Sequence, residues 1–132
     1  RCDVPIRAEV DRTVNKPASA DVRTELGAGP EVKLVYRLVQ LKCGDTVYSR
    51  AENWYRPDRL TPEMNEALTA DDTPYGVAIR PLSPTRRTLA IEFPDEAGIV
   101  LRHRAIVLSG AGTPLAAVVE SYTPELLAQP SR

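Results

Sequence analysis

Residues 36–54 read Tyr36-Arg-Leu-Val-Gln-Leu-Lys-Cys-Gly-Asp-Thr-Val-Tyr-Ser-Arg-Ala-Glu-Asn-Trp54, two β-rich runs on either side of Gly44-Asp45. A Gly-Asp pair between such runs is typical of a tight hairpin. Because side chains alternate across a strand, the second run puts four of them on one face: Tyr48, Arg50, Glu52 and Trp54. Two rings with an arginine and a glutamate between them are an unusual core, so we interpret this face as the wall of a pocket.

Strands and short helices are predicted on both sides of this hairpin. β-Rich runs cover residues 4–10, 31–43, 46–54, 77–80, 88–93, 99–108 and 115–122. A helix is predicted over residues 17–26, and two more begin at the Thr-Pro-Glu sequences of Thr61 and Thr123. A hydroxyl cap, a proline and an acid in the first turn favour a helix start there. The hairpin connections predict an antiparallel sheet with helices packed on it, an α+β fold.

The length and composition indicate one globular domain spanning residues 1–132. The 17 basic and 18 acidic residues are interspersed and give a net charge of -1. This balance predicts neither a nucleic-acid partner nor an anionic membrane partner. No apolar run approaches the roughly 18–20 residues that span a bilayer. The chain begins at Arg1 instead of a methionine, so we expect a processed or partial product; its oligomeric state is left open.

Cys2 and Cys43 leave two alternatives open, because two cysteines are too few for a disulfide scaffold or a zinc site. They are either two buried thiols or a single bridge that ties the N-terminus to the end of the first long strand. A bridge would close a loop of about 40 residues and contribute roughly 3–4 kcal/mol through the unfolded state. It would also require an oxidising compartment.

The familiar signatures of cofactor and metal chemistry are missing from the sequence. It contains no glycine-rich phosphate loop, no HExxH and no CxxC. His103 is the one histidine, so a metal site would have to consist mostly of carboxylates. Ser109 and Ser121 have no base at a recognisable spacing, which argues against a serine nucleophile. We therefore expect no cofactor and no metal.

Five charged residues are embedded in β-rich runs: Arg37, Arg50, Glu52, Arg104 and Glu120. Charges are rarely buried without partners, so some of these should pair with one another. One interpretation is an ordinary arginine–glutamate network, or solvent-facing positions. The other is an anion pocket, in which an arginine binds a carboxylate and a glutamate orients the arginine or accepts a proton. The alternation also puts Arg37 on one face with three aliphatic residues: Val35, Val39 and Leu41.

Several motifs carry a family resemblance: residues 36–44, Ser49-Arg-Ala-Glu-Asn-Trp-Tyr-Arg-Pro57, the Thr73-Pro-Tyr-Gly76 turn, residues 103–110 and Glu120-Ser-Tyr-Thr-Pro124. Together they resemble the chorismate pyruvate-lyase family over roughly residues 31–128. The chain is most similar to lyase-like bacterial proteins of unassigned activity, and the ligand-sensing domain of some bacterial transcription regulators shares their fold. Many of those lyase-like proteins look exported. The resemblance therefore favours an exported or periplasmic location and the bridged cysteines.

The resemblance implies a six-stranded antiparallel sheet whose helices enclose an internal cavity. In the lyases, chorismate bound in that cavity loses pyruvate without the help of a cofactor, and 4-hydroxybenzoate is the product that remains. Gly76 matches the turn glycine that offers its backbone amide, and Glu120 matches the last-strand glutamate that handles the proton. A gapless alignment of the hairpin places Glu52 where the family has its carboxylate-binding arginine. Arg50 lies two residues earlier on the same face.

We therefore predict a chorismate-lyase-like domain that binds a small aromatic or carboxylated ligand in an internal cavity, and leave its turnover open. The candidate catalytic residues are Glu120 and Arg50. The candidate ligand-binding residues are Arg50, Glu52, Trp54, Tyr75, Gly76 and Arg104. Two alternatives remain: an active chorismate lyase, which is a cofactor-independent carbon–oxygen lyase, and a non-catalytic interaction module whose cavity is filled by its own side chains.

Overall fold

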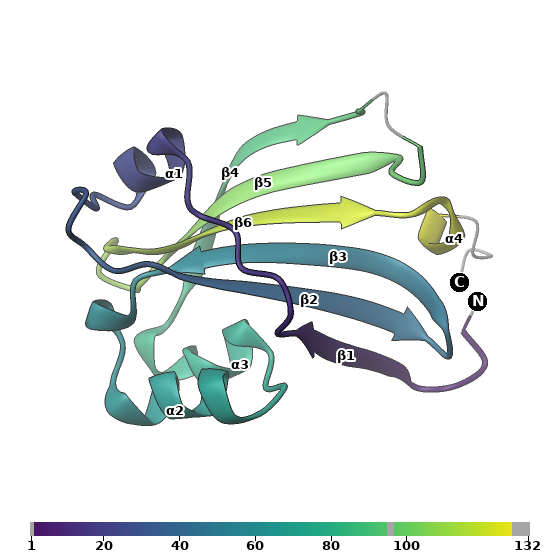
Figure 1. Cartoon of the computed structure of the whole chain (residues 1–132), viewed down its shortest axis with the longest axis horizontal. Coiled ribbons are helices and arrows are strands. Elements are labelled where there is room, and N and C mark those ends of the chain that lie inside the picture. The colour runs from purple at the N-terminus through teal and green to yellow at the C-terminus, as the bar shows by residue number, and fades with distance from the viewer. Residues whose placement is uncertain (1, 95–96, 128–132) are drawn as a thin grey trace.

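One antiparallel sheet of six strands runs through the computed structural model, which describes residues 2–94 and 97–127 (Figure 1). The strands are β1 (Ile6–Asp11), β2 (Val35–Cys43), β3 (Thr46–Tyr55), β4 (Thr85–Glu92), β5 (Leu101–Leu108) and β6 (Pro114–Tyr122). Their order across the sheet is β1-β2-β3-β6-β5-β4, and every neighbouring pair is antiparallel. The predicted α+β fold is confirmed.

Short helices cover both faces of this sheet. They are α1 (Ala20–Glu25), η1 (Pro57–Arg59), α2 (Pro62–Ala70), α3 (Tyr75–Ala78), η2 (Arg80–Leu82) and α4 (Pro124–Leu127). In Figure 1, α1 lies at the upper left of the sheet and α2 and α3 lie at the lower left, while the segment between β1 and α1 crosses over β2, β3 and β6. Two sets of buried side chains, one on each face, hold these layers together.

On the face covered by α1, buried residues of the helix and its C-cap pack against alternate residues of the strands: Val22, Leu26, Trp54, Ile106 and Ala117. We call this side of the sheet the α1 face. On the opposite side, which we call the α2/α3 face, the core is formed by Tyr55, Met64, Leu68, Ile79, Ala105, Val107, Leu115, Ala116 and Val118. The alternation of inward positions along each strand thus provides a core on both sides.

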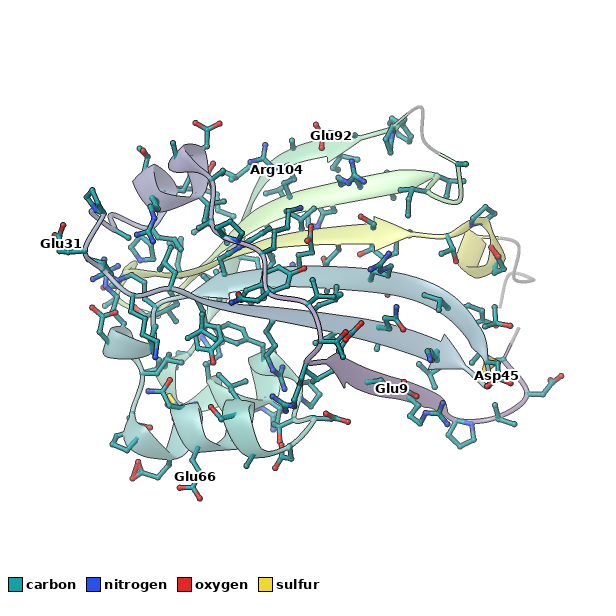
Figure 2. The ribbon with its side chains drawn as sticks, viewed as in Figure 1. Glu9, Glu31, Asp45, Glu66, Glu92 and Arg104 are labelled. Atoms are coloured by element: carbon teal, nitrogen blue, oxygen red, sulfur yellow. A yellow bond between two sulfur atoms is a disulfide. The ribbon has the colours of Figure 1, made fainter. Side chains whose placement is uncertain are left out.

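Side-chain caps explain where the two longer helices begin. The Thr61 hydroxyl accepts a hydrogen bond from the Met64 amide at 3.2 Å, as the Thr-Pro-Glu sequence predicts. In α2 the side chains of Met64 and Leu68 are buried, whereas Glu66 points away from the sheet (Figure 2). The first helix is shorter than predicted, because Ser19 and not the preceding proline forms its start: the Ser19 hydroxyl accepts from the Val22 amide at 3.1 Å.

Residues 77–80, predicted as a strand, are helical in the structure, and this prediction is wrong. The amides of Val77 and Ala78 both donate to the Pro74 carbonyl at 3.0 Å, which closes the turn of α3. The side chain of Ile79, which is 0% exposed, enters the core of the α2/α3 face from this turn. A short apolar run suits a buried helical turn as well as a strand, so periodicity alone did not separate the two.

Cys2 and Cys43 form a disulfide, with their Cα atoms 5.6 Å apart and 41 positions apart in the sequence. The bridge fastens the segment before β1 to the end of β2, beside the pairing of Ile6 with Cys43. Of the two alternatives that the sequence leaves open, the bridge is therefore the one that the structure contains. Within the described residues, no helix has the length and hydrophobicity needed to cross a membrane.

Candidate functional site

The pairing of β3 with β6 divides the predicted site residues between the two faces of the sheet. Arg50 lies opposite Ser121, whereas Glu120 lies opposite Ala51. Directly paired residues point to the same side and successive residues point to opposite sides. The prediction that Arg50 and Glu120 act together in one cavity is therefore wrong, because the sheet separates their side chains.

The α1 face carries a hollow of about 600 Å³. Four of the six candidate ligand-binding residues line it: Arg50, Glu52, Trp54 and Arg104. Figure 2 shows Arg104 on β5 beside α1, where its guanidinium lies 3.7 Å from the carboxylate of Glu25. Lys16 and Arg102 add two further cations to the lining. This hollow therefore has a basic wall, and Arg50 borders it; whether Arg50 binds a ligand there stays a prediction.

Most polar groups of the α1-face hollow already have partners within the chain. The Glu52 carboxylate accepts from the Tyr36 hydroxyl at 2.7 Å and from Lys16 Nζ at 3.3 Å. The Trp54 indole donates to the Lys16 carbonyl at 2.9 Å. Burial, reinforced by the bond to Glu52, raises the pKa of the Tyr36 hydroxyl far above its usual value. These contacts hold the segment before α1 onto the sheet, so Glu52 and Trp54 have a structural role.

A second hollow, of about 400 Å³, lies on the α2/α3 face between the sheet and the segment that includes α3 and η2. It contains the other three predicted site residues, Tyr75, Gly76 and Glu120. Nothing lies within 4 Å of the position where a Cβ would stand on Gly76. Apolar side chains form most of the remaining wall: Ala8, Val39, Leu41, Ala51, Pro74, Ile79, Pro84, Val107 and Val118. The hollow on this side of the sheet is therefore lined mainly by apolar side chains.

Arg37 is the unusual group in this second hollow. Its side chain is 4% exposed, and no carboxylate of the described residues forms an ion pair with it. Its Nη2 donates to the carbonyls of Thr73 at 2.7 Å and Asp71 at 3.3 Å, whereas Nε and Nη1 are buried without a hydrogen-bond partner. Desolvation lowers the pKa of Arg37 accordingly. Burying a cation whose donors are unpaired costs free energy of folding. Arg37 therefore lacks part of the hydrogen bonding that a buried guanidinium needs.

The buried Arg56 shows how a structural arginine is satisfied in the same chain. Its Nη1 donates to the carbonyls of Leu26 and Gly27, and its Nη2 lies 2.7 Å from the Asp58 carboxylate. The hydrogen bond to Asp58 raises the pKa of Arg56, the opposite direction to Arg37. The contrast indicates that burial alone does not account for the unpaired nitrogens of Arg37.

Two neutral side chains that line the same hollow also have unpaired atoms. Asn53 lies directly opposite Arg37 in the β2–β3 pairing, and its buried Oδ1 has no partner. The Tyr75 hydroxyl is likewise buried and unpaired, with the ring centroid 5.5 Å from that of Tyr55. Burial raises the pKa of Tyr75 far above its usual value, so the hydroxyl stays neutral. Of the five buried side-chain atoms without a partner in the described residues, four belong to Arg37, Asn53 and Tyr75, all of which line this hollow.

Glu120 also lines this hollow, and its carboxylate has partners. Its carboxylate accepts from Arg86 Nη2 at 2.9 Å, lies 3.3 Å from His103 Nδ1, and accepts from the Tyr122 hydroxyl at 3.4 Å. Burial, together with the charge of Glu120, raises the pKa of Tyr122. Among residues 2–94 and 97–127, no group of three or more histidine, cysteine, aspartate or glutamate side chains gathers as a metal site would require.

A comparison of sequences finds one curated relative and no matching family model. The relative is the uncharacterized protein y4mC of Sinorhizobium fredii (strain NBRC 101917 / NGR234), to which the chain is 39% identical over 139 aligned residues. The alignment covers 89% of the chain and 59% of the relative. The chain therefore spans somewhat more than half of the length of this relative.

Solved structures with similar architecture come from bacterial transcription regulators. The C-terminal domain of the histidine utilization repressor from Pseudomonas syringae pv. tomato str. DC3000 matches 96% of the chain with a TM-score of 0.66 and 13% identity, and 98% of that domain is covered. The effector domain of PhnF from Mycobacterium smegmatis matches 91% of the chain with a TM-score of 0.66 and 10% identity, and 83% of it is covered. A ligand-binding domain of a GntR-family regulator from Bordetella bronchiseptica matches 88% of the chain with a TM-score of 0.55 and 20% identity, and 82% of it is covered.

The chain has the fold of GntR-family effector domains. The part of the prediction that invoked the ligand-sensing domains of transcription regulators is confirmed at the level of the fold. Membership of the lyase family itself stays a prediction. In this effector-domain fold, the α2/α3-face hollow contains both the turn with Gly76 and the last-strand Glu120 that the sequence motifs single out.

Sequence reasoning missed the residues that make this hollow polar. The sequence indicates Arg37 as a strand charge but not as a site residue, and the alternation of residues 46–54 puts Asn53 on the face opposite the expected pocket. The available signal was the alternation of Arg37 with Val35, Val39 and Leu41, which put a charge on an otherwise aliphatic face. In this effector-domain fold that aliphatic face borders the hollow.

Proposed function

We propose that this domain is a ligand-sensing module that binds a small organic anion in the α2/α3-face hollow. The observation that carries the proposal is the buried guanidinium of Arg37, whose Nε and Nη1 have no partner in the described residues. An anionic group of a ligand would supply both the missing hydrogen bonds and the missing charge. The effector-domain fold of the chain supports the same conclusion.

The other residues that line the hollow indicate the polarity and size of the rest of the ligand. Aliphatic side chains and the Tyr75 ring form most of the surface, so the body of the ligand is apolar or aromatic. A volume of about 400 Å³ lies at the lower end of small-molecule sites, which commonly span roughly 300–1,000 Å³. The proposed ligand is therefore a small aromatic or short branched acid.

A chorismate lyase is the second candidate function, because three groups that such a reaction needs meet in this hollow. Glu120 and Gly76 are the two family positions matched by the sequence, and Arg37 lines the same space. If the domain is a lyase with its site in this hollow, Arg37, and not Arg50, contacts the chorismate carboxylate. The alternative of a module whose cavity is filled by its own side chains is disfavoured by the open volume.

A thermal-shift screen with small organic acids tests the proposal. Benzoate, phenylacetate and chorismate at saturating concentration are compared on the wild type, on Arg37→Gln and on Arg50→Gln. At least one acid should raise the melting temperature of the wild type and of Arg50→Gln, and should leave that of Arg37→Gln unchanged. If all three proteins respond alike, or none responds to any acid, the hollow at Arg37 is not an anion site.

Turnover is measured in the same samples. Release of pyruvate and 4-hydroxybenzoate from chorismate would support the lyase candidate, and its loss in Glu120→Gln would assign the proton transfer. A ligand-induced shift without product at high enzyme concentration would leave the sensing function and exclude the lyase.

We also propose that the domain works in an oxidising compartment, such as an exported or periplasmic location. The support is the Cys2–Cys43 bridge, since disulfides of this kind rarely persist in a reducing cytosol. Alkylation of the protein in freshly lysed cells, followed by mass spectrometry, tests this: bridged cysteines agree with the proposal, and two alkylated thiols contradict it.

A further inference from the structure

The α1-face hollow, which the proposed function does not use, is lined by more cations than carboxylates. The described residues around it include four cationic side chains, Lys16, Arg50, Arg102 and Arg104, and one carboxylate, that of Glu52. Lys16 Nζ lies 3.3 Å from the Glu52 carboxylate, so these two charges compensate each other. The three arginines therefore give the lining of this hollow an excess of positive charge.

The strand register places the three arginines on the same side of the sheet. Arg50 on β3 and Arg102 on β5 are both paired with Ser121, which lies on β6 between them. Paired residues point to the same side, and Arg104 follows Arg102 by two positions and shares that side. Because neighbouring strands lie about 4.8 Å apart, the backbones of Arg50 and Arg102 are roughly 10 Å apart. The Arg102 Nε donates to the Ser121 hydroxyl at 3.3 Å, so this row faces the hollow as one polar surface.

Two of these arginines have donors to spare for a ligand. In the described part of the chain, Arg50 forms no ion pair and no side-chain hydrogen bond. Hydrogen bonds from Thr13 lower the pKa of Asp11, and the charge of Arg50 contributes to the same shift without an ion pair between the two side chains. Arg104 lies 3.7 Å from the Glu25 carboxylate, longer than the roughly 2.7–2.9 Å of a strong charge-assisted hydrogen bond. Since a guanidinium has five N–H donors, Arg50 and Arg104 can both bind a further anion.

The number of cations determines which anion suits this hollow. A single carboxylate carries one charge and engages one guanidinium bidentately, which leaves the other arginines without an anion. An anion with two or more charges can contact Arg50 and Arg104 together, and each added charge increases the Coulomb attraction. The volume of about 600 Å³ falls within the roughly 300–1,000 Å³ of small-molecule sites. The lining therefore favours a small polyanion over a monovalent acid.

We propose that the α1-face hollow is a second binding site, which takes a small polyanion on Arg50 and Arg104. Either several carboxylates or a phosphate group can supply the charges. The inference goes beyond the proposed function, whose ligand binds on the opposite side of the sheet through one anionic group on an apolar body. Because the sheet separates the two hollows, a polyanion and a small apolar acid can be bound at the same time. Selectivity for charge is thus the property to measure.

Isothermal titration at low ionic strength measures this selectivity. Citrate, pyrophosphate and acetate are titrated into the wild type, Arg50→Gln, Arg104→Gln and the matched control Arg80→Gln. Arg80 is an exposed arginine that lines neither hollow, so its replacement removes the same charge elsewhere on the surface. Circular dichroism of each variant shows that it is folded.

At least one polyanion should bind the wild type and Arg80→Gln with similar affinity, and about tenfold or more weakly to Arg50→Gln and Arg104→Gln. Acetate should bind the wild type at least about tenfold more weakly than that polyanion. Binding of citrate alone would assign a polycarboxylate to the site, and binding of pyrophosphate alone would assign a phosphate compound. Both results support the inference.

Three results would overturn the inference. Wild type that binds neither polyanion has no such site, and equal affinities in all four proteins would show attraction to the overall charge. Displacement of the bound polyanion by saturating benzoate would place it in the α2/α3-face hollow instead. None of these results decides the proposed function, because that function is tested by the response of Arg37→Gln to monovalent acids.

Discussion

Arg37 and Asn53 are direct partners across the β2–β3 pairing; both line the α2/α3-face hollow, and each has side-chain polar atoms that are buried without a hydrogen-bond partner. In an apolar core such a pair would destabilise the fold, because each unpaired buried polar atom lowers the free energy of unfolding. Beside an open volume, such a pair supports the proposed ligand site. The predictions below follow from this relationship and from the contacts that surround it.

Asn53→Leu should stabilise the protein in the absence of ligand. Leucine has a similar size and removes an amide oxygen that is buried without a partner, so the free energy of unfolding should rise by about 1 kcal/mol. Asn65→Leu is the matched control: Asn65 Oδ1 is also unpaired, but its Nδ2 donates to the Pro57 carbonyl at 3.0 Å, and losing that bond should destabilise the protein. Urea denaturation distinguishes them; equal changes would contradict the interpretation.

The two buried arginines should respond differently to replacement by methionine. Arg56→Met removes hydrogen bonds to two carbonyls and to Asp58, and should lower the free energy of unfolding by about 2–3 kcal/mol. Arg37→Met loses two carbonyl contacts but also removes an unpaired buried charge, so its cost should be clearly smaller. A larger loss in Arg37→Met, measured by chemical denaturation, would show that Arg37 is structural.

Reducing the disulfide should destabilise the fold without changing ligand binding. The bridge closes a long loop, so the Cys2→Ser, Cys43→Ser double variant should lose roughly 3–4 kcal/mol of unfolding free energy. Neither cysteine lines the α2/α3-face hollow, and acid affinity in the folded variant should therefore match that of the wild type. Calorimetry measures both quantities; an altered affinity would link the bridge to the site.

Acidification should weaken the turn that holds Arg37. The Asp71 carboxylate accepts from the hydroxyl of Thr73 and, at 2.8 Å, from its amide, and these bonds lower the pKa of Asp71 below 3.8. Because the folded pKa is depressed, this contribution to stability is complete above 3.8 and is lost as the pH falls through the folded pKa. Asp71→Asn should remove this part of the pH dependence in denaturation curves, whereas Asp72→Asn should retain it.

Features of the fold that depend on neighbouring residues could be predicted from the sequence. The face of each strand follows from alternation, and the start of α2 follows from its Thr-Pro-Glu cap. The site was only partly accessible, since joining Arg50 with Glu120 requires the register between β3 and β6, which are far apart in the chain. A shift of one residue moves a side chain to the other face. The chemistry of Arg37 was hidden for a similar reason: whether a buried charge has a partner depends on contacts that no local pattern contains.

The most direct test of the account is the side-chain nuclear magnetic resonance signal of Arg37 during titration with an organic acid that stabilises the protein. A ligand carboxylate on the guanidinium should shift the Arg37 Nε–Hε resonance and slow its exchange with water, while the Arg50 signal on the opposite face stays unchanged. A bound acid that leaves the Arg37 resonance in place, or that shifts Arg50 instead, would contradict the assignment of the α2/α3-face hollow as the ligand site.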